Sequence, residues 1–352
     1  MNVAEQIVAQ LVDAGVHRIY GIVGDSLNPI VDAVRKTGGS KKGGIDWIHV
    51  RHEEAAAFAA SAEAQLTGKL AVCAGSCGPG SLHLINGLYD ANRTGAPVLA
   101  IASHIPSVQI GSTYFQETHP DRIFEECSVY NELISSAAQS PRTVNSAIRH
   151  AVGLGGVSVI TLPGDVSDLK AVEHVPTYAP ARPATLAPNP ADIDEAAALL
   201  NKADKVAIFA GAGVKGAHDE VIALADALKA PIGHSLRGKH FIQYDNPFDV
   251  GMTGLLGYGA AAEGMNDADV LILLGTDFPY DQFLPDTPTI QVDTHAEKLG
   301  RRTDVGLAIH AQVKPFIEAL LPHLRAGRSD SFLKSKIKKH SEIMHAPVGA
   351  YT

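Results

Sequence analysis

The sequence has little cysteine, and its histidines are not arranged as metal ligands. Cys73, Cys77 and Cys127 form no CxxC pair, and an odd number of cysteines argues against a disulfide framework or a zinc site. The 16 histidines show no HExxH or other tight ligand spacing, so we predict no metal site in this chain. We expect the cysteines to be small buried thiols.

Long apolar runs and basic clusters are also lacking. No apolar run approaches the roughly 18 residues of a membrane-spanning helix, and no charged-then-apolar signal segment opens the chain. We therefore expect a cytoplasmic protein without membrane contact. The net charge of −9 argues against nucleic acid as a partner. The one locally basic stretch, KSKIKK at 334–339, predicts a solvated helix face.

What is present is a regular alternation of apolar strands and amphipathic helices. In the first half the strands are about 25 residues apart, which predicts parallel βαβ units in a doubly wound sheet. We expect helices over 3–15, 27–38, 53–68, 79–95 and 142–155, and strands over 17–24, 45–50, 70–76, 97–103 and 156–165.

A proline-rich break divides the chain. Residues 171–192 contain five prolines and no periodicity, which predicts a linker. The alternation then restarts, so we expect a second α/β domain. The predicted order is a domain over 1–170, a linker over 171–190, a second domain over 191–330 and a C-terminal linker over 331–352.

Two adjacent acids stand at the start of the alanine-rich helix. Glu53 and Glu54 follow a predicted strand, and seven of the twelve residues from Ala55 to Leu66 are alanine. Acids favour a helix N-terminus and alanine favours helix, so a purely structural explanation is available. A small-faced helix also lets a second backbone or subunit approach. A carboxyl carried into such a dry interface could perform acid–base chemistry.

Functional loops in open α/β sheets follow the carboxyl ends of the strands. GAGVKG at 211–216 has this position and matches the GxGxxG fingerprint of dinucleotide-binding domains. The strand that follows leads to Arg237 rather than to an acid for a ribose. An NADP-dependent reductase is therefore one reading, and a glycine turn needed only for packing is another.

Other strand-end loops favour a longer ligand. Gly251, Gly254 and Gly257 lie in a glycine-rich loop, and Asp293 ends a later strand. Together with the 211–216 loop they predict a long groove that suits FAD. In the first half, His83 and Asn86 share a predicted helix face, although a lone helix histidine is usually structural. Phe115 and Gln116 in YFQETHP offer an apolar wall beside an amide for a substrate, although loops contain such pairs by chance.

Six stretches together resemble the thiamine-diphosphate-dependent pyruvate oxidases, and most of all their quinone-reducing branch, the bacterial pyruvate dehydrogenases (quinone). The stretches are RHEEAAAFAASAEAQLTG, AVCAGSCGPGSLHLINGLYDA, YFQETHP, SLRGK, YDNPFDVGMTGLLG and LLGTDFPY. The resemblance runs from about residue 3 to about residue 325.

The resemblance implies a fold of three α/β domains, of which this chain matches a pyrimidine-binding domain and then a Rossmann-like FAD-binding domain. The family's third domain binds diphosphate and Mg²⁺ through a GDG motif and a downstream Asn. No such motif occurs here, so we expect the pyrophosphate-binding domain to be absent and the chain alone to be inactive.

The resemblance also implies roles for individual residues. Glu53 matches the glutamate that hydrogen-bonds the aminopyrimidine of thiamine diphosphate and promotes its imino tautomer. His83, Phe115 and Gln116 match active-centre positions, as does the Gly24, Asp25 and Ser26 turn. The implied FAD contacts are Gly211, Gly213, Arg237, Thr253, Gly254, Leu255, Leu256, Thr276, Asp277, Phe278, Pro279, Tyr280 and Asp293.

The implied activity is oxidative decarboxylation of pyruvate to acetate and CO₂, with electrons passing to FAD and then to a quinone. Family active sites lie between subunits, so a homo-oligomer, dimer or tetramer, is expected. Full-length relatives are peripheral at the inner face of the cell membrane. The alternatives are a non-catalytic FAD-binding module, an NADP-dependent reductase and an acetohydroxyacid synthase-like carboligase; oxygen is the alternative electron acceptor.

Overall fold

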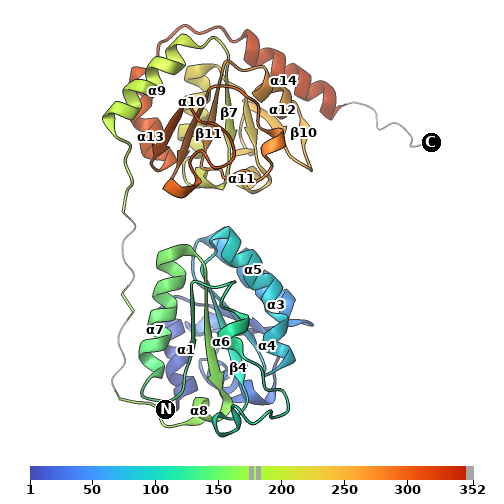
Figure 1. The fold of residues 1–352 in the computed structure, drawn as a ribbon, viewed down its shortest axis with the longest axis vertical. Helices are drawn as coiled ribbons and strands as arrows, with labels where there is room; N and C mark the ends of the chain where they lie inside the picture. The colour runs from blue at the N-terminus through green and yellow to red at the C-terminus, as the bar shows by residue number, and fades with distance from the viewer. Residues whose placement is uncertain (174–177, 180–183, 346–352) are drawn as a thin grey trace, which may run out of the picture. The chain divides into compact units, whose positions relative to one another are not determined.

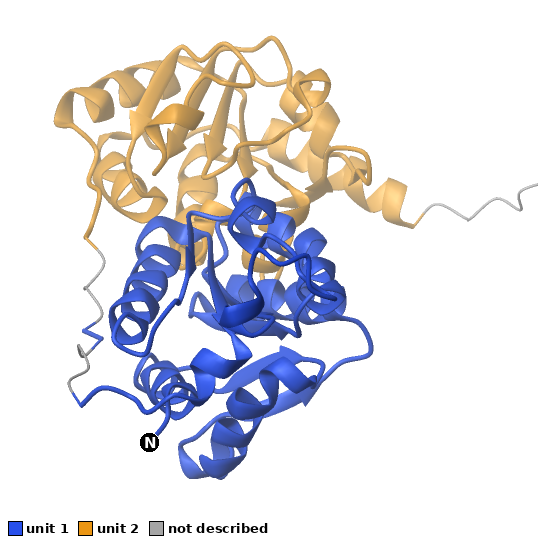
Figure 2. Ribbon diagram, turned by 60° about the horizontal axis from the view of Figure 1, so that its bottom comes forward, with its two compact units in different colours: residues 1–182 blue, residues 183–352 orange. Residues whose placement is uncertain are grey.

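The chain folds into two compact units. The computed structural model describes residues 1–173, 178–179 and 184–345. Unit 1 comprises residues 1–182 and unit 2 residues 183–352 (Figure 2). The predicted linker over 171–190 covers this division, and its residues 174–177 and 180–183 lie outside the described residues.

Unit 1 is built on a six-stranded parallel sheet with the order β2-β1-β3-β4-β6-β5. Its central strands β3, β4 and β6 are buried along their whole length, as expected of parallel strands covered on both faces. The strands are β1 Arg18–Gly21, β2 Asp46–His49, β3 Ala71–Gly75, β4 Val98–His104, β5 Tyr130–Leu133 and β6 Val157–Pro163.

Helices cover both faces of this sheet (Figure 1). One apolar cluster joins the sheet to α1, α2, α7 and α8, and the other joins it to α3 and α5. The helices of unit 1 are α1 Val3–Asp13, α2 Asn28–Lys36, α3 Glu53–Thr67, α4 Pro79–His83, α5 Ile85–Thr94, α6 Pro120–Ile123, α7 Ser140–His150 and α8 Gly164–Asp168.

Unit 2 contains a seven-stranded sheet with the order β10-β9-β8-β7-β11-β12-β13, in which only β10 is antiparallel to its neighbour. Without β10, this is the strand order of a dinucleotide-binding Rossmann fold. The strands are β7 Val206–Ala210, β8 Ile232–His234, β9 Asp249–Met252, β10 Tyr258–Gly259, β11 Val270–Leu274, β12 Thr289–Asp293 and β13 Leu307–His310.

The helices of unit 2 also lie on two faces. Residues of α9, α10 and α13 pack into the main core, as does Leu333 of α14, whereas α12 and other residues of α14 contribute to smaller apolar clusters with other parts of the sheet. The helices are α9 Pro190–Lys202, α10 His218–Leu228, α11 Leu236–Ile242, α12 Ala261–Asn266, α13 Val313–Leu320 and α14 Ser331–Met344. The predicted α/β class with two doubly wound sheets is confirmed.

The cysteines behave as the sequence predicts. All three are free and buried, and burial raises the pKa of Cys73 to about 12. Among the described residues, no helix has the length and apolarity needed to cross a bilayer.

Several elements differ from the expectation. The single helix predicted over 79–95 is two helices, α4 and α5, which meet at Leu84. The stretch around Gly251, Gly254 and Gly257, expected as a glycine-rich loop, begins within the end of β9 and is followed directly by β10 and then α12. The strands β5 and β13 were not predicted, because their mixed burial leaves no continuous apolar run.

The predictions for the C-terminal segment need correction. Residues 331–352 were expected to be a linker, but α14 packs on unit 2, with Leu333 in its core; residues 346–352 lie outside the described residues. The KSKIKK stretch was expected to be a solvated face, yet Lys336 is only 4% exposed. Its ammonium donates to Glu263, at 2.7 Å, and to Asp267.

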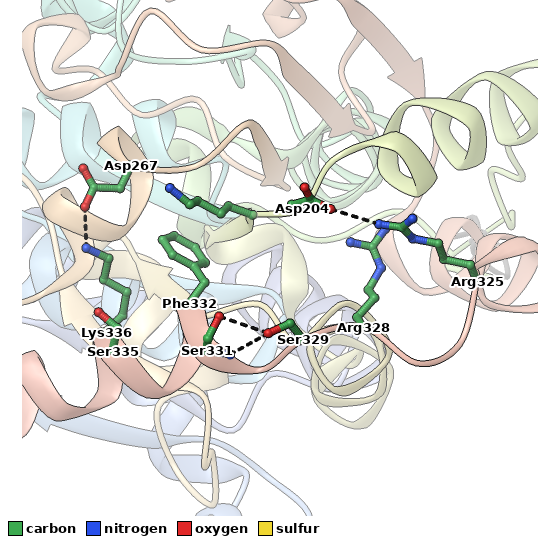
Figure 3. A pocket seen from close by; sticks show the side chains of 10 residues that line it. Asp204, Asp267, Arg325, Arg328, Ser329, Ser331, Phe332, Ser335 and Lys336 are labelled. Carbon is green, nitrogen blue, oxygen red and sulfur yellow. Dashed lines mark hydrogen bonds and ion pairs between the residues drawn. The ribbon is translucent and has the colours of Figure 1, made fainter.

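These contacts explain how α14 is held (Figure 3). Burial alone lowers the pKa of Lys336, but its hydrogen bonds to Asp267 and Glu263 outweigh that effect and leave the pKa raised. At the other end of the same cavity, of about 490 Å³, Arg328 donates to the carbonyls of Leu200 and Ala203 at the end of α9. The cations around this cavity therefore attach the C-terminal segment to unit 2.

We predict that Lys336→Ala destabilises unit 2 by about 1–3 kcal/mol. Breaking a fully buried ion pair costs about 3–5 kcal/mol, and the loss is expected to be smaller here because Glu263 and Asp267 are about half exposed. Urea unfolding followed by circular dichroism measures the loss. Fluorescence of Trp47, the single tryptophan, follows unit 1 and is expected not to change. Lys334→Ala, at an exposed pair with Asp330, is the control; an equal loss in both variants would contradict this account.

Candidate active site

The polar loops of unit 1 meet where the strand order reverses. The chain passes from β1 outward to β2 and then back to β3, so the loops after β1 and β3 flank the switch point. The hydroxyl groups of Ser26 and Ser76 lie 2.9 Å apart, and the Cys77 N–H donates to Ser26 at 3.0 Å. A Cβ at Gly24 would lie 2.3 Å from the Ser76 hydroxyl oxygen. The close approach of the two loops therefore requires glycine there.

Glu53 lies at the same edge, as the first residue of α3. His52 caps this helix, because its Nδ1 accepts the Glu54 N–H at 3.3 Å. Glu53 is 8% exposed. A Cβ added at Gly80 would lie 3.1 Å from Glu53 Oε1, so the carboxyl is inserted against a part of α4 that carries no side chain.

His83 is the polar partner of this carboxyl. Its Nδ1 lies 3.3 Å from Glu53 Oε2, and its side chain is 48% exposed while that of Glu53 is 11% exposed. Glu53 and His83, each predicted for the active centre, are thus brought together by two different helices. The carboxyl is covered on one side and reaches solvent through an imidazole, an arrangement that suits controlled proton exchange.

His52 is a neighbour of this pair that was not predicted from the sequence. Its ring stacks on that of His83, with centroids 4.4 Å apart and planes inclined by 26°. The signal available in the sequence was its position directly before Glu53. Asn86, one turn from His83, donates to Glu54 at 2.7 Å instead of reaching Glu53.

The alanines of α3 let another backbone of the same chain come close. Of the two partners expected for this small-residue face, a second backbone or a subunit, the structure shows the first: Ala56, Ala57, Ala60 and Ala64 pack within the chain against α5 and the sheet. A Cβ at Gly87 of α5 would lie 2.5 Å from that of Ala57. Small residues on both helices therefore let α3 lie close to α5.

The remaining predicted residues of unit 1 are placed less uniformly. Gln116 lies beside the loop after β3, with its Oε1 3.5 Å from Cys77 Sγ. Phe115 is 77% exposed. Asp25 is exposed and accepts the Ser26 N–H at 2.7 Å. The structure thus assembles Gly24, Ser26, Glu53, His83 and Gln116 around one sheet edge and leaves Phe115 and Asp25 in solvent.

In unit 2 the GAGVKG motif does not form an open phosphate loop. The Gly213 N–H donates to the Gly275 carbonyl at 2.9 Å, and a Cβ at Gly211 would lie 2.3 Å from the same oxygen. The following helix, α10, begins only at His218, after the motif. These glycines serve the packing of the β7 loop on the β11 loop, which does not favour the NADP reading.

The predicted FAD contacts share the carboxyl edge of this sheet. A Cβ at Gly254, which has φ of 112°, would lie 3.2 Å from Phe278 and 3.7 Å from Tyr280, so the loops after β9 and β11 touch. Thr253, Thr276, Phe278 and Asp293 are buried, whereas Leu255 and Leu256 are 67% and 68% exposed. Pro279 lies in the β11 loop, and Arg237 lies in the first turn of α11.

Two of the acids in these loops already have partners. Asp277 pairs with Arg301 and Arg302, neither of which the sequence analysis selected. Asp293 accepts the His295 N–H at 2.9 Å. Elsewhere in the part of the chain that the structure describes, no group of three or more His, Cys, Asp or Glu side chains could hold a metal ion.

Comparison with protein families gives two matches. Residues 1–123 match the model "Thiamine pyrophosphate enzyme, N-terminal TPP binding domain". Residues 193–320 match "Thiamine pyrophosphate enzyme, central domain".

Comparison with individual proteins gives relatives along nearly the whole chain. An uncharacterized 42.6 kDa protein from the isoamylase 3′ region of Pseudomonas amyloderamosa is 54% identical over 94% of this chain and 83% of its own length. YdaP of Bacillus subtilis (strain 168), provisionally described as a thiamine pyrophosphate-containing protein, is 40% identical over 86% of this chain and 52% of its own length.

Pyruvate oxidase of Lactiplantibacillus plantarum is 32% identical over 92% of this chain and 54% of its own length. Acetolactate synthase large subunits match as well. The chain thus spans about half the length of YdaP and of the pyruvate oxidase.

Proposed function

The chain belongs to the thiamine pyrophosphate enzyme family, in which it matches the N-terminal and central domains, and from this premise we propose that it serves oxidative decarboxylation of pyruvate. The products are acetate and CO₂, and the electrons pass to FAD and then to a quinone. The observation that carries the proposal is the buried Glu53 carboxyl, paired with His83 at the switch point of the unit 1 sheet.

The residues of unit 1 fit the aminopyrimidine end of thiamine diphosphate. When bound, this cofactor supplies a thiazolium carbon that becomes nucleophilic on losing a proton. Glu53 would hold or release a proton at its carboxyl, of which one oxygen lies against Gly80 of α4. His83 holds the other oxygen and is exposed enough to exchange protons with solvent. The Gln116 amide lies near the same edge and can orient a carboxylate substrate.

The residues of unit 2 fit a flavin better than a nicotinamide cofactor. Leu255 and Leu256 offer exposed apolar surface beside the touching loops after β9 and β11. Thr253 and Thr276 place hydroxyl groups in the same loops. Absorbance of bound flavin in the purified protein tests this assignment.

Carboligation, as the name acetolactate synthase describes for other relatives, is the second candidate. It is favoured because two acetolactate synthase subunits are about 30% identical to this chain, which is close to the identity of the pyruvate oxidase. Product analysis with pyruvate separates the two functions, since acetate with a reduced acceptor indicates oxidation and acetolactate indicates carboligation.

We propose that the protein is a homo-oligomer joined in part by the outer face of α3. That face carries Phe58 and Leu66, 43% and 58% exposed, in line with Ala55 and Ala62. Light scattering at micromolar concentration is expected to give at least a dimer, and Phe58→Glu is expected to weaken it. Val152→Glu, at a residue 42% exposed on unit 1, is the matched control. A monomeric wild type would contradict the proposal.

We predict that Glu53→Gln abolishes pyruvate decarboxylation and leaves FAD bound, in a form of the protein that supplies a diphosphate- and Mg²⁺-binding region. The change keeps the size of the side chain but removes its proton-transfer group, whose loss typically costs ~10²–10⁴-fold. Glu54→Gln, one residue away and paired with Asn86, is the control and is expected to retain activity. Turnover of the Glu53 variant within about threefold of wild type, far less than that typical loss, would end the assignment.

We also predict that the 352-residue chain alone does not turn over pyruvate. A diphosphate bound through Mg²⁺ needs carboxylate and other oxygen ligands, and the GDG motif with a downstream Asn that the resemblance implies for this role does not occur in the sequence. Without the metal, an anionic cofactor would face a chain of net charge −9. A pyruvate-dependent dye-reduction assay with millimolar Mg²⁺ and excess thiamine diphosphate tests this; reproducible, cofactor-dependent turnover would show that the diphosphate site is built from these residues after all.

A further inference from the structure

The loop over 110–117, which carries Phe115 and Gln116, has an unusual backbone. Thr113 and Gln116 adopt left-handed conformations, with φ of 61° and 66°. Side chains other than glycine seldom adopt this region, and a β-branched residue such as Thr is especially unfavourable there. Conformations of this kind persist only where the surroundings hold them, and they cluster at functional sites.

The carboxylate of Glu117 is the group that holds this loop. Its Oε1 accepts the Gly111 N–H at 2.5 Å, and its Oε2 accepts the Tyr114 N–H at 3.1 Å. The Glu117 N–H donates to the Tyr114 carbonyl at 2.8 Å. The Glu117 side chain thus binds the backbone at Gly111, near the start of the loop, and at Tyr114, near its end. The Gly111 N–H, followed by the Tyr114 and Thr113 N–H groups, keeps the pKa of Glu117 below its usual value, so the carboxylate stays charged at neutral pH.

The same loop touches the edge of the candidate active site. A Cβ at Gly78, itself at φ of 68°, would lie 2.8 Å from Gln116 Cβ and 3.0 Å from its carbonyl oxygen. Gly78 follows Cys77, whose Sγ lies 3.5 Å from Gln116 Oε1. Gln116 therefore packs so closely on the loop after β3 that only a glycine fits at position 78. A shift of the Gln116 backbone would change the surroundings of the Gly78 amide.

We propose that Glu117 is a positioning residue: its carboxylate holds the 110–117 loop in the conformation that sets Gln116 against Cys77 and Gly78. Glu117 touches neither Glu53 nor His83 among the contacts of the described residues, so its effect passes through the backbone. Any contact of Phe115 or Gln116 with a substrate rests on the proposed function. The closure of the loop by Glu117 does not depend on the proposed function.

The test follows two glycine amides in the wild type and in Glu117→Gln. Glycine labelled with ¹⁵N, combined with cysteine labelled with ¹³C at its carbonyl, isolates Gly78, because Cys77–Gly78 is the only Cys–Gly pair in the sequence. Carbonyl-labelled isoleucine in a second sample selects Gly111 and Gly233, the two glycines that follow isoleucine. Gly233 lies in unit 2 and serves as an internal reference.

We expect the wild-type Gly111 proton to resonate downfield of an ordinary glycine amide, because its hydrogen bond to a charged carboxylate is stronger than one to a neutral acceptor. In Glu117→Gln this downfield position is expected to be lost and the Gly78 signal to move, with Gly233 unchanged. Glu125→Gln is the matched control, since Glu125 is exposed and its carboxylate makes no hydrogen bond among the described residues; neither signal is expected to move in it.

Two results would overturn the proposal. An unchanged Gly111 signal would show that Glu117 does not close the loop. A shifted Gly111 with an unchanged Gly78 would show that the closure is local and that Gln116 is placed by other contacts. If Glu117→Gln does not fold, Glu117→Asp, which keeps the charge but shortens the reach, is expected to move the same two signals. No cofactor or substrate is needed, so failure here is distinct from failure of the proposed function.

Discussion

The close approach of α3 to α4 and α5 is the constraint on which the candidate active site depends. It is made possible by missing side chains, since Gly80 leaves room for the Glu53 carboxyl and Gly87 for the backbone at Ala57 and Phe58. Larger residues at either place would move the start of α3 outward and hydrate the carboxyl. Burial of this one acid beside His83 therefore follows from packing between helices, and the acid–base role proposed for it rests on this placement.

The two units have the same sheet geometry, but the loops at the carboxyl edge of each sheet differ in character. Both gather polar loops at the carboxyl edge of parallel strands, as open α/β sheets do. In unit 1 the loops after β1 and β3 are joined by serine hydroxyl groups and stay polar and partly open. In unit 2 the loops after β7 and β11 are packed glycine against glycine. The apolar side chains Leu255 and Leu256 remain exposed next to them, and this surface suits a planar ring system.

Much of this fold could be predicted from the sequence, because fully buried strands such as β3 and β4 leave apolar runs that periodicity detects. The edge strands β5 and β13 could not, since their mixed burial resembles a loop. Position after a strand was enough to select Glu53, but its burial depends on Gly80, 27 residues later. Lys336 was misread because a buried lysine and a solvated one look alike until their partners are known. The left-handed residues Thr113 and Gln116 gave no sequence signal at all.

The central claim is that Glu53 handles a proton for the aminopyrimidine of thiamine diphosphate. The most direct measurement is the rate at which the thiazolium carbon of the cofactor exchanges its proton for deuterium. This rate is compared between the bound cofactor and the cofactor free in solution at the same pH. The protein is used in a form that also binds the diphosphate of the cofactor. The account predicts exchange on the protein at least ~10²-fold faster, the lower end for one positioned acid–base group. Exchange no faster than in free cofactor would contradict it.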